Sequence, residues 1–360
     1  MIKTYKYKIY PTKKQVVSLE SQLEGHRFLY NQALFQKKEV YEQTGKGLGY
    51  TAQATGLLPK LKKESKNLAL CNYSSLQQTL RRLDKSYKAF FRKIKTGQKA
   101  GYPRFKTAER FNTVNYASFG DGCQIKENRL YLQNVGCIKV KWHRSIDGNI
   151  KTLSVTRRNN KRYVSFVVEC ATNFLPVTGK VVGIDVGLNA FVTTSDGVQI
   201  SSPKYLRQSK RKLSKAQRLL SRRKKGSARR RKARIFVSKH YEKIANQRLD
   251  FCHKIAHWLV KNYDGFSVEN LNIKNMVKNR HLAKSISDAG WGMFLNILKC
   301  KAESAGRWYQ EIIPNGTSQE CSQCGSVVKK SLAVRVHNCP YCGLSLDRDV
   351  NAALNILKKA

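Results

Sequence analysis

Three carboxylates in this 360-residue sequence stand where they could bind metal ions. Asp185 ends a short apolar run between glycines, Glu269 closes a second strand-like run, and Asp349 lies at the start of a helical pattern. If the fold brings them together, they form a set of oxygen ligands suited to Mg2+ or Mn2+, with positions open for phosphate oxygens. Two such ions would stabilise the attacking and leaving oxygens of phosphodiester cleavage. The pattern therefore supports the hypothesis that the protein is a nuclease.

Four paired cysteines give the most specific pattern. Cys321 and Cys324 form one Cys-x-x-Cys-Gly turn, and Cys339 and Cys342 form a second one fourteen residues later. Four thiolates from two such turns favour the closed tetrahedral shell of a structural Zn2+ ion over a redox dithiol or an iron–sulfur site. No open coordination position is implied, so this site is expected to hold a fold and not to catalyse.

Six further cysteines occur singly, in apolar or mixed surroundings. They are expected to be reduced thiols of the core or the surface. They are Cys71, Cys123, Cys137, Cys170, Cys252 and Cys300.

The formal net charge is +46, from 69 Lys and Arg against 23 Asp and Glu. Such an excess predicts a polyanion partner, and nucleic acid is the leading class because it binds Lys and Arg strongly through its phosphates. A membrane surface is disfavoured: the sequence has no apolar run of about 18 residues, and its first residues lack the apolar stretch of a signal peptide. We therefore expect a cytoplasmic location, nucleoid-associated in a prokaryote.

The elements before residue 100 are mostly helical. Residues 1–10 alternate weakly and predict a strand, after which Thr12 and Gln15 form a capping-box pattern that begins a long amphipathic helix. The glycines at 45–49 break this helix. A second capping-box pattern, Ser74 with Gln77, predicts another helix whose basic face is expected to contact nucleic acid.

Residues 102–177 change to short runs of β-branched and aromatic residues between turns. This sequence pattern predicts an antiparallel sheet or small barrel, with a hairpin connection at 158–161. Residues 1–10 could pair into this sheet, and the helical stretch between them would then be an insertion.

The stretch after Asp185 predicts strands and then helices. Residues 191–194 and 197–200 flank a turn and should form antiparallel strands beside the first one. The basic segment 207–234 suggests two helices hinged at 226–227, followed by a separate helix over 237–262. His240, His253 and His257 lie on that helix and are interpreted as ordinary helix residues, because they have no partner cysteine or acidic cluster nearby.

The order of these motifs resembles the TnpB (OrfB) proteins of bacterial insertion sequences, relatives of the type V CRISPR nucleases. The resemblance covers nearly the whole chain and is most specific from Asp185 onward. The matching segments are Gly183-Ile-Asp185-Val-Gly187, Val268-Glu269-Asn-Leu271, the two Cys-x-x-Cys-Gly turns and Asp349-Val-Asn-Ala-Ala-Leu-Asn-Ile356.

The resemblance implies an α+β multidomain fold. Its parts would be an RNase H-like (RuvC) α/β nuclease domain with an inserted zinc ribbon, and an amino-terminal β-barrel-like (WED) domain with a helical (REC) insertion. The expected boundaries are residues 1–10 and 111–178 for the WED-like domain, 11–110 for the REC-like insertion, and 179–360 for the RuvC-like domain, with the ribbon at about 316–346.

The resemblance also implies a site and partners. Asp185, Glu269 and Asp349 would be the catalytic triad that binds Mg2+ (or Mn2+), with Asp349 favoured over Asp347 by the family pattern. The protein would act as a monomer on each RNA, holding a guide RNA from the transposon end that pairs with target DNA next to a short adjacent motif. It would meet target DNA in both double-stranded and single-stranded form.

Two other functions remain open. A strand-transferring transposase, or an accessory to one, would join donor ends to a target. A nuclease-inactive regulator would bind nucleic acid only, and the carboxylates would be turn and cap residues. The complete triad argues against the regulator.

Overall fold

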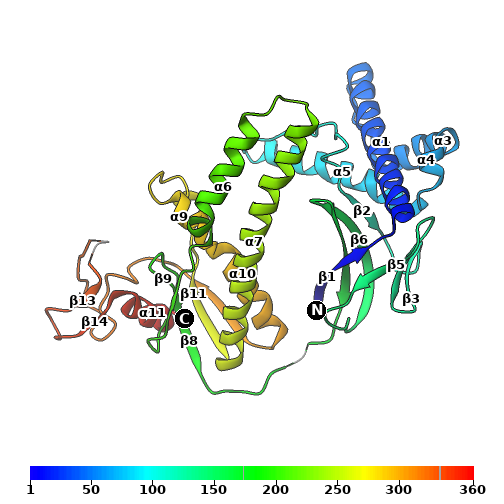
Figure 1. Ribbon diagram of the computed structural model, residues 1–360. Coiled ribbons are helices and arrows are strands. Elements are labelled where there is room, and N and C mark those ends of the chain that lie inside the picture. The colour runs from blue at the N-terminus through cyan, green and yellow to red at the C-terminus, as the bar shows by residue number, and fades with distance from the viewer. Residues whose placement is uncertain (173, 332–333) are drawn as a thin grey trace. The chain divides into compact units, whose positions relative to one another are not determined.

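The computed structural model describes residues 1–172, 174–331 and 334–360. The chain is mixed α/β and divides into two compact units, residues 1–171 and residues 172–360 (Figure 1). Each unit has its own hydrophobic core, so each is described by itself.

The first unit contains an antiparallel sheet of seven described strands, in the order β2-β6-β7-β1-β5-β4-β3. The first strand of the chain pairs with β5 on one side and β7 on the other, which confirms that residues 1–10 join the later sheet. The strands are β1 (Ile2–Tyr10), β2 (Thr113–Tyr116), β3 (Cys123–Lys126), β4 (Arg129–Leu132), β5 (Gly136–Lys141), β6 (Asn149–Arg158) and β7 (Lys161–Glu169).

A tight hairpin joins β6 to β7, as the sequence predicts. Its two turn residues, Asn159 and Asn160, have φ angles of 49° and 61°. Asn tolerates the left-handed region better than most residues, and two such residues in succession give the turn whose twist matches that of the strands.

Helices fill the chain between β1 and β2. They are α1 (Lys13–Thr44), α2 (Tyr50–Ala52), the π-helix η1 (Gln53–Leu57), α3 (Leu58–Glu64), α4 (Lys66–Ala69) and α5 (Tyr73–Lys95). The capping box of Thr12 and Gln15 is confirmed, and α1 ends at Gly45, whose φ of 66° favours glycine.

The predicted cap of the second long helix is wrong by two residues. Helix α5 begins after Asn72, whose side chain accepts a hydrogen bond from the Ser75 amide at 2.9 Å. Ser74 is already inside the helix, and its hydroxyl contacts Asp121. Asn caps helices as well as Ser does, and both side chains bond Asp121 in the sheet unit, Asn72 at 2.8 Å.

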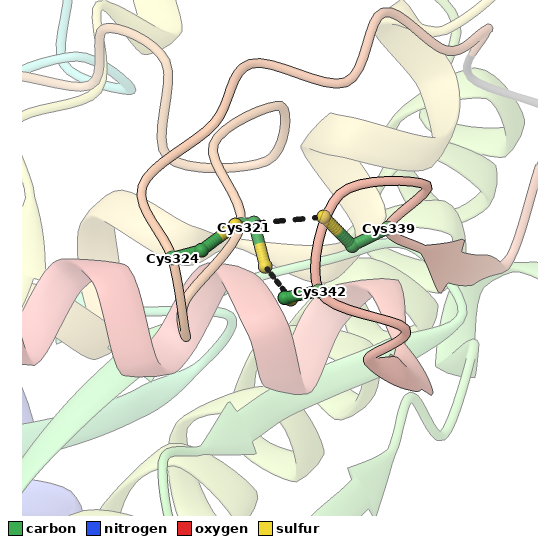
Figure 2. A group of neighbouring side chains, drawn as sticks. All are labelled: Cys321, Cys324, Cys339 and Cys342. Atoms are coloured by element: carbon green, nitrogen blue, oxygen red, sulfur yellow. Dashed lines mark hydrogen bonds between the residues drawn. The ribbon is translucent and has the colours of Figure 1, made fainter.

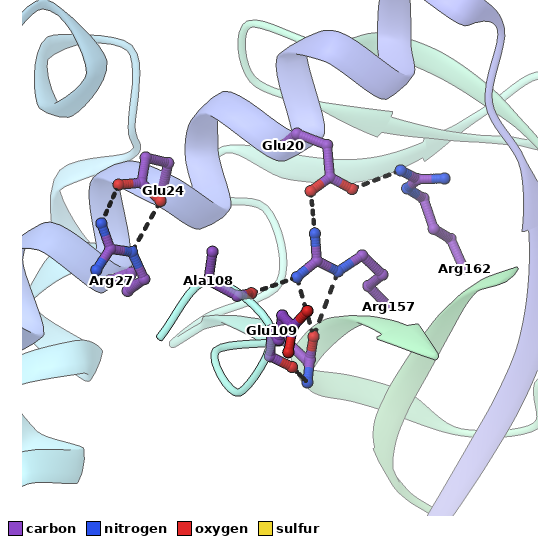
Figure 3. Close-up of polar contacts among 8 residues, drawn as sticks. Glu20, Glu24, Arg27, Ala108, Glu109, Arg157 and Arg162 are labelled. Carbon is purple, nitrogen blue, oxygen red and sulfur yellow. Dashed lines mark hydrogen bonds and ion pairs between the residues drawn. The ribbon is translucent and has the colours of Figure 1, made fainter. Parts of the chain in front are cut away.

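A carboxylate on α1 ties the helices to the sheet. Glu20 accepts hydrogen bonds from Arg157 on β6 and, at 2.6 Å, from Arg162 on β7 (Figure 3). Arg157 also donates to the Ala108 carbonyl, in the segment that leads from α5 to β2. One hydrophobic core continues from the helices into the sheet, so the insertion and the strands fold as one unit.

The second unit contains a sheet of five described strands, in the order β10-β9-β8-β11-β12. The three strands β8, β11 and β12 are parallel, whereas β9 and β10 are antiparallel additions, as predicted for residues 191–200. The strands are β8 (Val181–Asp185), β9 (Ala190–Thr194), β10 (Gln199–Ser201), β11 (Gly265–Glu269) and β12 (Trp308–Ile312); a separate pair is β13 (Val336–Asn338) and β14 (Ser345–Asp347).

Two long helices form a hairpin between β10 and β11, visible in green in Figure 1. The turn at Gly226 and Ser227 is confirmed, but the predicted break near residue 235 is wrong: α7 is continuous over 35 residues. Leu213 of α6 and Val237 and Ile244 of α7 share a small core, which explains why the helix does not stop there. The helices are α6 (Tyr205–Ser221), α7 (Ala228–Asn262), α8 (Ile273–Met276), α9 (Ala283–Ala289), α10 (Trp291–Ser304) and α11 (Arg348–Lys358).

The last helix, α11, packs directly on the strand that ends in Asp185. A Cβ atom at Gly183 would lie 2.1 Å from the Ala353 carbonyl oxygen and 2.8 Å from the Leu357 amide nitrogen. The buried hydroxyl of Ser267 on β11 donates to the Ile356 carbonyl at 2.8 Å. The backbone of α11 is therefore held against both strands that carry carboxylates.

No helix within the described residues has the length and apolarity needed to cross a membrane.

We predict that Gly183→Ala destabilises the second unit by about 1–3 kcal/mol, because the new methyl group forces the backbones of β8 and α11 apart. Urea unfolding followed by tryptophan fluorescence measures this, since Trp258, Trp291 and Trp308 lie in this unit. Gly47→Ala is the control, because a Cβ there meets nothing within 4 Å. Equal urea midpoints for the two variants would contradict the close approach.

Candidate active site

The three predicted carboxylates gather at one end of the second sheet. Strands β8 and β11 are parallel with Val268 opposite Ile184, so the residues that follow, Asp185 and Glu269, end neighbouring strands at the same edge. Asp349 lies in the first turn of α11, and its Oδ2 is 4.0 Å from where a Cβ would stand on Gly187. The helix thus brings its carboxylate to the loop that follows β8.

The negative charges of Glu269 and Asp349 act on Asp185. Burial, together with these two charges, raises the pKa of Asp185 to about 7, against a smaller lowering by Arg348. Clustered carboxylates resist ionisation together unless a cation compensates them. The donor set and its charge therefore fit hard divalent cations such as Mg2+ or Mn2+.

Glu269 is oriented by a contact that the sequence did not suggest. The Thr317 hydroxyl donates to its Oε1. Burial raises the pKa of Glu269, while the hydrogen bond from Thr317 and the nearby charge of Lys359 lower it. Thr317 comes from the segment that leads into the first cysteine turn, so this segment positions a carboxylate of the sheet.

Asp349 and Asp347 have different roles. Asp347 caps α11, and its Oδ1 accepts from the Asp349 and Val350 amides at 2.8 and 3.2 Å. The Asp349 side chain is 12% exposed, and its carboxylate lies near two arginines: Arg348 at 3.3 Å and Arg335 at 3.8 Å. The cap fixes the helix start, while Asp349 lies close enough to Asp185 to raise its pKa.

The carboxylates are more widely spaced than the ligands of a single small ion. Among the described residues, only the cysteine group has three or more potential ligand atoms that all lie within 4.8 Å of one another. His240, His253 and His257 lie on α7, as the sequence predicts.

The four paired cysteines meet as the sequence predicts (Figure 2). The Sγ atoms of Cys321 and Cys342 are 3.6 Å apart, as are those of Cys324 and Cys339. A tetrahedral ion with Zn–S bonds of about 2.3 Å separates its sulfur ligands by about 3.8 Å. The group fits a zinc ion, and the remaining six cysteines are free thiols, four of them buried.

The ionisation of these thiols also suits a cation. Hydrogen bonds from Ser326 lower the pKa of Cys324 to about 6. The Leu344 amide lowers the pKa of Cys342, but burial and hydrogen bonds with the other three thiols outweigh it and raise the value to about 12. Thiolates this close to one another repel, and a bound cation relieves that repulsion.

Two asparagines of α11 fasten the cysteine turns to the helix. Asn351 donates to the Glu320 carbonyl at 2.8 Å and accepts from the Ser322 amide at 2.9 Å. Asn355 donates to the carbonyls of Thr317 and Glu320 at 2.8 and 2.7 Å. The ribbon, Asp349 and the Thr317 contact to Glu269 thus form one connected structure.

Sequence reasoning missed Arg335, Thr317 and Asn189. With its amide oxygen toward Arg335, Asn189 accepts two hydrogen bonds from that guanidinium, at 2.7 and 3.1 Å. Each of these residues acts through a partner far away in the sequence, so no local pattern marks it. Asn351 and Asn355 were part of the quoted carboxyl-terminal motif, and their spacing of four residues on one helix face was the available signal.

Three family models match the chain. "Probable transposase" of the OrfB/IS605 group matches residues 165–280, and "Cas12f1-like, TNB domain" matches residues 291–356, which include the cysteine turns. A third, described as "Helix-turn-helix domain", matches residues 1–46, which here form β1 and the single helix α1.

Two relatives match nearly end to end. A Streptomyces pristinaespiralis protein named "Putative RNA-guided DNA endonuclease" is 33% identical over 370 residues, covering 99% of this chain and 88% of its own. The chain belongs to the TnpB (OrfB) family. InsQ of Escherichia coli K12, with the same descriptive name, is 29% identical and covers 99% of this chain and 92% of its own. The resemblance seen in the motifs is confirmed.

A solved structure supports the fold of this TnpB-family chain. The protein titled "mini-RNA-guided endonuclease CRISPR-Cas_phi3" matches with a TM-score of 0.52 at 10% identity, covering 99% of this chain and 92% of that one. At this identity the likeness shows the fold alone.

We predict that Asp185→Asn stabilises the protein in magnesium-free buffer at pH 8 by about 1–3 kcal/mol. The folded pKa of Asp185, about 7, exceeds the unfolded value, so the wild type loses stability as pH rises from about 4 to about 7. The Asn variant cannot lose it, and the two proteins should converge near pH 4. Urea unfolding at several pH values measures this. Asp250→Asn, an exposed site on α7, is the control; a difference independent of pH contradicts the assignment.

We predict that Cys321→Ser releases the zinc ion and lowers the thermal unfolding temperature, because three thiolates no longer close the shell. Metal analysis and calorimetry measure the two effects. Cys300→Ser removes an exposed thiol of α10 and should change the unfolding free energy by no more than about 0.5 kcal/mol. Full zinc content in the Cys321 variant would reject the site.

Proposed function

We propose that this protein is an RNA-guided, metal-dependent DNA endonuclease encoded by an insertion sequence. A guide RNA derived from the transposon end pairs with target DNA next to a short adjacent motif, and the protein cuts that DNA. The observation that carries the proposal is the convergence of Asp185, Glu269 and Asp349 at one sheet edge, in a chain whose end-to-end relatives are named as endonucleases of this kind.

The three carboxylates are the catalytic and metal-binding residues of the proposal. Two Mg2+ ions bound by them would supply stabilisation of the attacking and leaving oxygens of a phosphodiester. The chain's own contribution is orientation. Thr317 fixes Glu269, and the cap at Asp347 fixes the start of the helix that carries Asp349. The guanidinium groups of Arg335 and Arg348 lie 3.8 and 3.3 Å from the Asp349 carboxylate and partly neutralise its charge.

The zinc ion of the proposal is structural. Cys321, Cys324, Cys339 and Cys342 would hold it in a closed shell with no position for substrate. Through Asn351 and Asn355 the ribbon holds the helix that carries Asp349, so zinc acts on cleavage by positioning and not by chemistry.

The net charge of +46 supports binding of guide RNA and of target DNA, double-stranded and single-stranded. In RNA-guided recognition, base pairing supplies sequence specificity while the protein holds the backbone and reads the adjacent motif. The protein acts as a monomer on each RNA, in the cytoplasm of a prokaryote and associated with its nucleoid, where the target DNA lies.

The domain roles follow the same proposal. Residues 1–10 and 111–178 form a β-barrel-like WED domain, and residues 11–110 form its helical REC insertion. Residues 179–360 form the RuvC-like nuclease domain, with the zinc ribbon at about 316–346. The basic face of α5 belongs to the insertion and supports a nucleic-acid contact there.

We predict that the protein, expressed with its native flanking DNA, copurifies with one abundant RNA whose 3′ segment reads into the flanking sequence. The loaded complex should cut matching DNA in Mg2+, and Asp349→Asn should abolish cutting while sparing DNA binding, because it removes a metal ligand and leaves the basic surface intact. RNA sequencing, a cleavage assay and a binding assay measure these outcomes.

Asp347→Asn is the matched control, since Asn caps a helix about as well as Asp and the change removes the same charge two residues away. It should retain cleavage. Cleavage at full rate by Asp349→Asn would reject the triad. Joined DNA products would indicate a strand-transferring transposase, and binding without cleavage under several guides would indicate a regulator.

A further inference from the structure

A cavity of about 450 Å³ lies beside the loop that follows β8. Three segments line it: this loop through Asn189, the start of α6 through its N-cap Lys204 and Arg207, and α9 through Lys284 and Asp288. Lys210, one turn further along α6, completes the cationic lining. Ligand cavities typically measure roughly 300–1,000 Å³, so this one has room for a nucleotide.

The charge of the cavity is unbalanced. It is lined by four cations and one carboxylate, and that carboxylate is already engaged: Asp288 accepts from Arg248 at 2.9 Å and from the Leu206 amide at 3.1 Å. Within the part of the chain that the structure describes, none of the four cations pairs with a carboxylate. Four like charges around one space repel one another, and a bound anion relieves this repulsion. We call this space the four-cation cavity.

The four-cation cavity is connected to the carboxylate site. Asn189 lines it and accepts hydrogen bonds from Arg335, whose guanidinium also lies 3.8 Å from Asp349. Asn189 is four residues beyond Asp185, so their Cα atoms are at most about 14 Å apart. A DNA strand that places one phosphodiester at the carboxylates has neighbouring phosphates within reach of the cavity.

We propose that the four-cation cavity binds a phosphate of the DNA strand being cut, one or a few nucleotides from the cleaved bond. Lys204, Arg207, Lys210 and Lys284 are then positioning residues that set which phosphodiester reaches Asp185 and Asp349. The inference rests on the proposed nuclease function and adds to it a subsite for the substrate. Lysine and arginine side chains are the usual partners of nucleic-acid phosphates.

The test removes three cations without disturbing the backbone. Lys204 has a φ of 48°, which Asn tolerates better than most residues, so the variant is Lys204→Asn with Arg207→Gln and Lys284→Gln. The RNA-loaded complex is mixed with target DNA in saturating Mg2+, with the complex in excess over the DNA. We expect single-turnover cleavage about 10- to 100-fold slower, or a displaced cut, because a misplaced substrate reacts slowly. Target binding should change by less than about threefold, since three of 69 basic residues are removed.

The matched control removes three positive charges at a place outside the cavity. Arg222→Gln, Lys224→Gln and Lys225→Gln change exposed residues at the turn between α6 and α7, outside the cavity. This variant should cut within about threefold of the wild-type rate, as expected for surface changes that touch no substrate. Equal slowing by the two variants would mean a general charge effect and would overturn the proposal.

A second measurement identifies the phosphate itself. Single phosphates near the cut are replaced by uncharged methylphosphonates in the target strand. The wild type should be slowed at one position in particular, and the cavity variant should be insensitive at that position, because the contact is already lost. If the methylphosphonate slows the cavity variant by the same factor as it slows the wild type, the proposal is overturned.

Two other results are decisive. If the cavity variant retains less RNA but its loaded fraction cuts at the wild-type rate, the cavity serves the guide RNA and the DNA assignment is wrong. If the wild type, loaded with its RNA, cuts no DNA, the nuclease function itself fails and this inference fails with it. If the wild type cuts DNA and the cavity variant cuts it at the same rate, only the cavity proposal is overturned and the nuclease function stands.

Discussion

The close contact between α11 and β8 is the constraint on which the candidate site depends. At Gly183 the strand leaves no room for a side chain, because the backbone of α11 occupies that space. The helix start carries Asp349, and the strand end carries Asp185, so the distance between these carboxylates is fixed by backbone packing and not by flexible side chains. Ser267 adds a buried hydrogen bond from β11 to the same helix, which brings Glu269 into the same frame.

The cysteine ribbon acts on this frame from the outside. Its first turn is held by Asn351 and Asn355 of α11, and the segment before it sends Thr317 to Glu269. In the proposed function, a metal bound by the four thiols would therefore restrain two carboxylates without touching either. A soft, closed sulfur site would then give rigidity, and a hard oxygen site would remain open for chemistry.

The scarcity of acidic residues makes each one informative. Many of the 23 Asp and Glu have a structural partner: Glu20 joins α1 to β6 and β7, Asp264 pairs with Arg307, and Asp288 pairs with Arg248. Against this background, a buried Asp185 whose pKa is raised by burial and by the charges of Glu269 and Asp349 stands out as a site.

Local patterns determined the features that depend on neighbours in the sequence. The sequence predicts the two cysteine turns, the Asn159–Asn160 hairpin and the positions of Asp185 and Glu269 at strand ends. It does so because turn chemistry and period-two alternation act over a few residues. The family motifs then joined these carboxylates into one expected site. Tertiary structure decided the rest. Asn72 and not Ser74 caps α5, α7 runs unbroken through residue 235, and Thr317 and Arg335 reach the carboxylates. Each of these outcomes depends on contacts between segments distant in sequence, where burial and hydrogen-bond partners choose among local options of nearly equal energy.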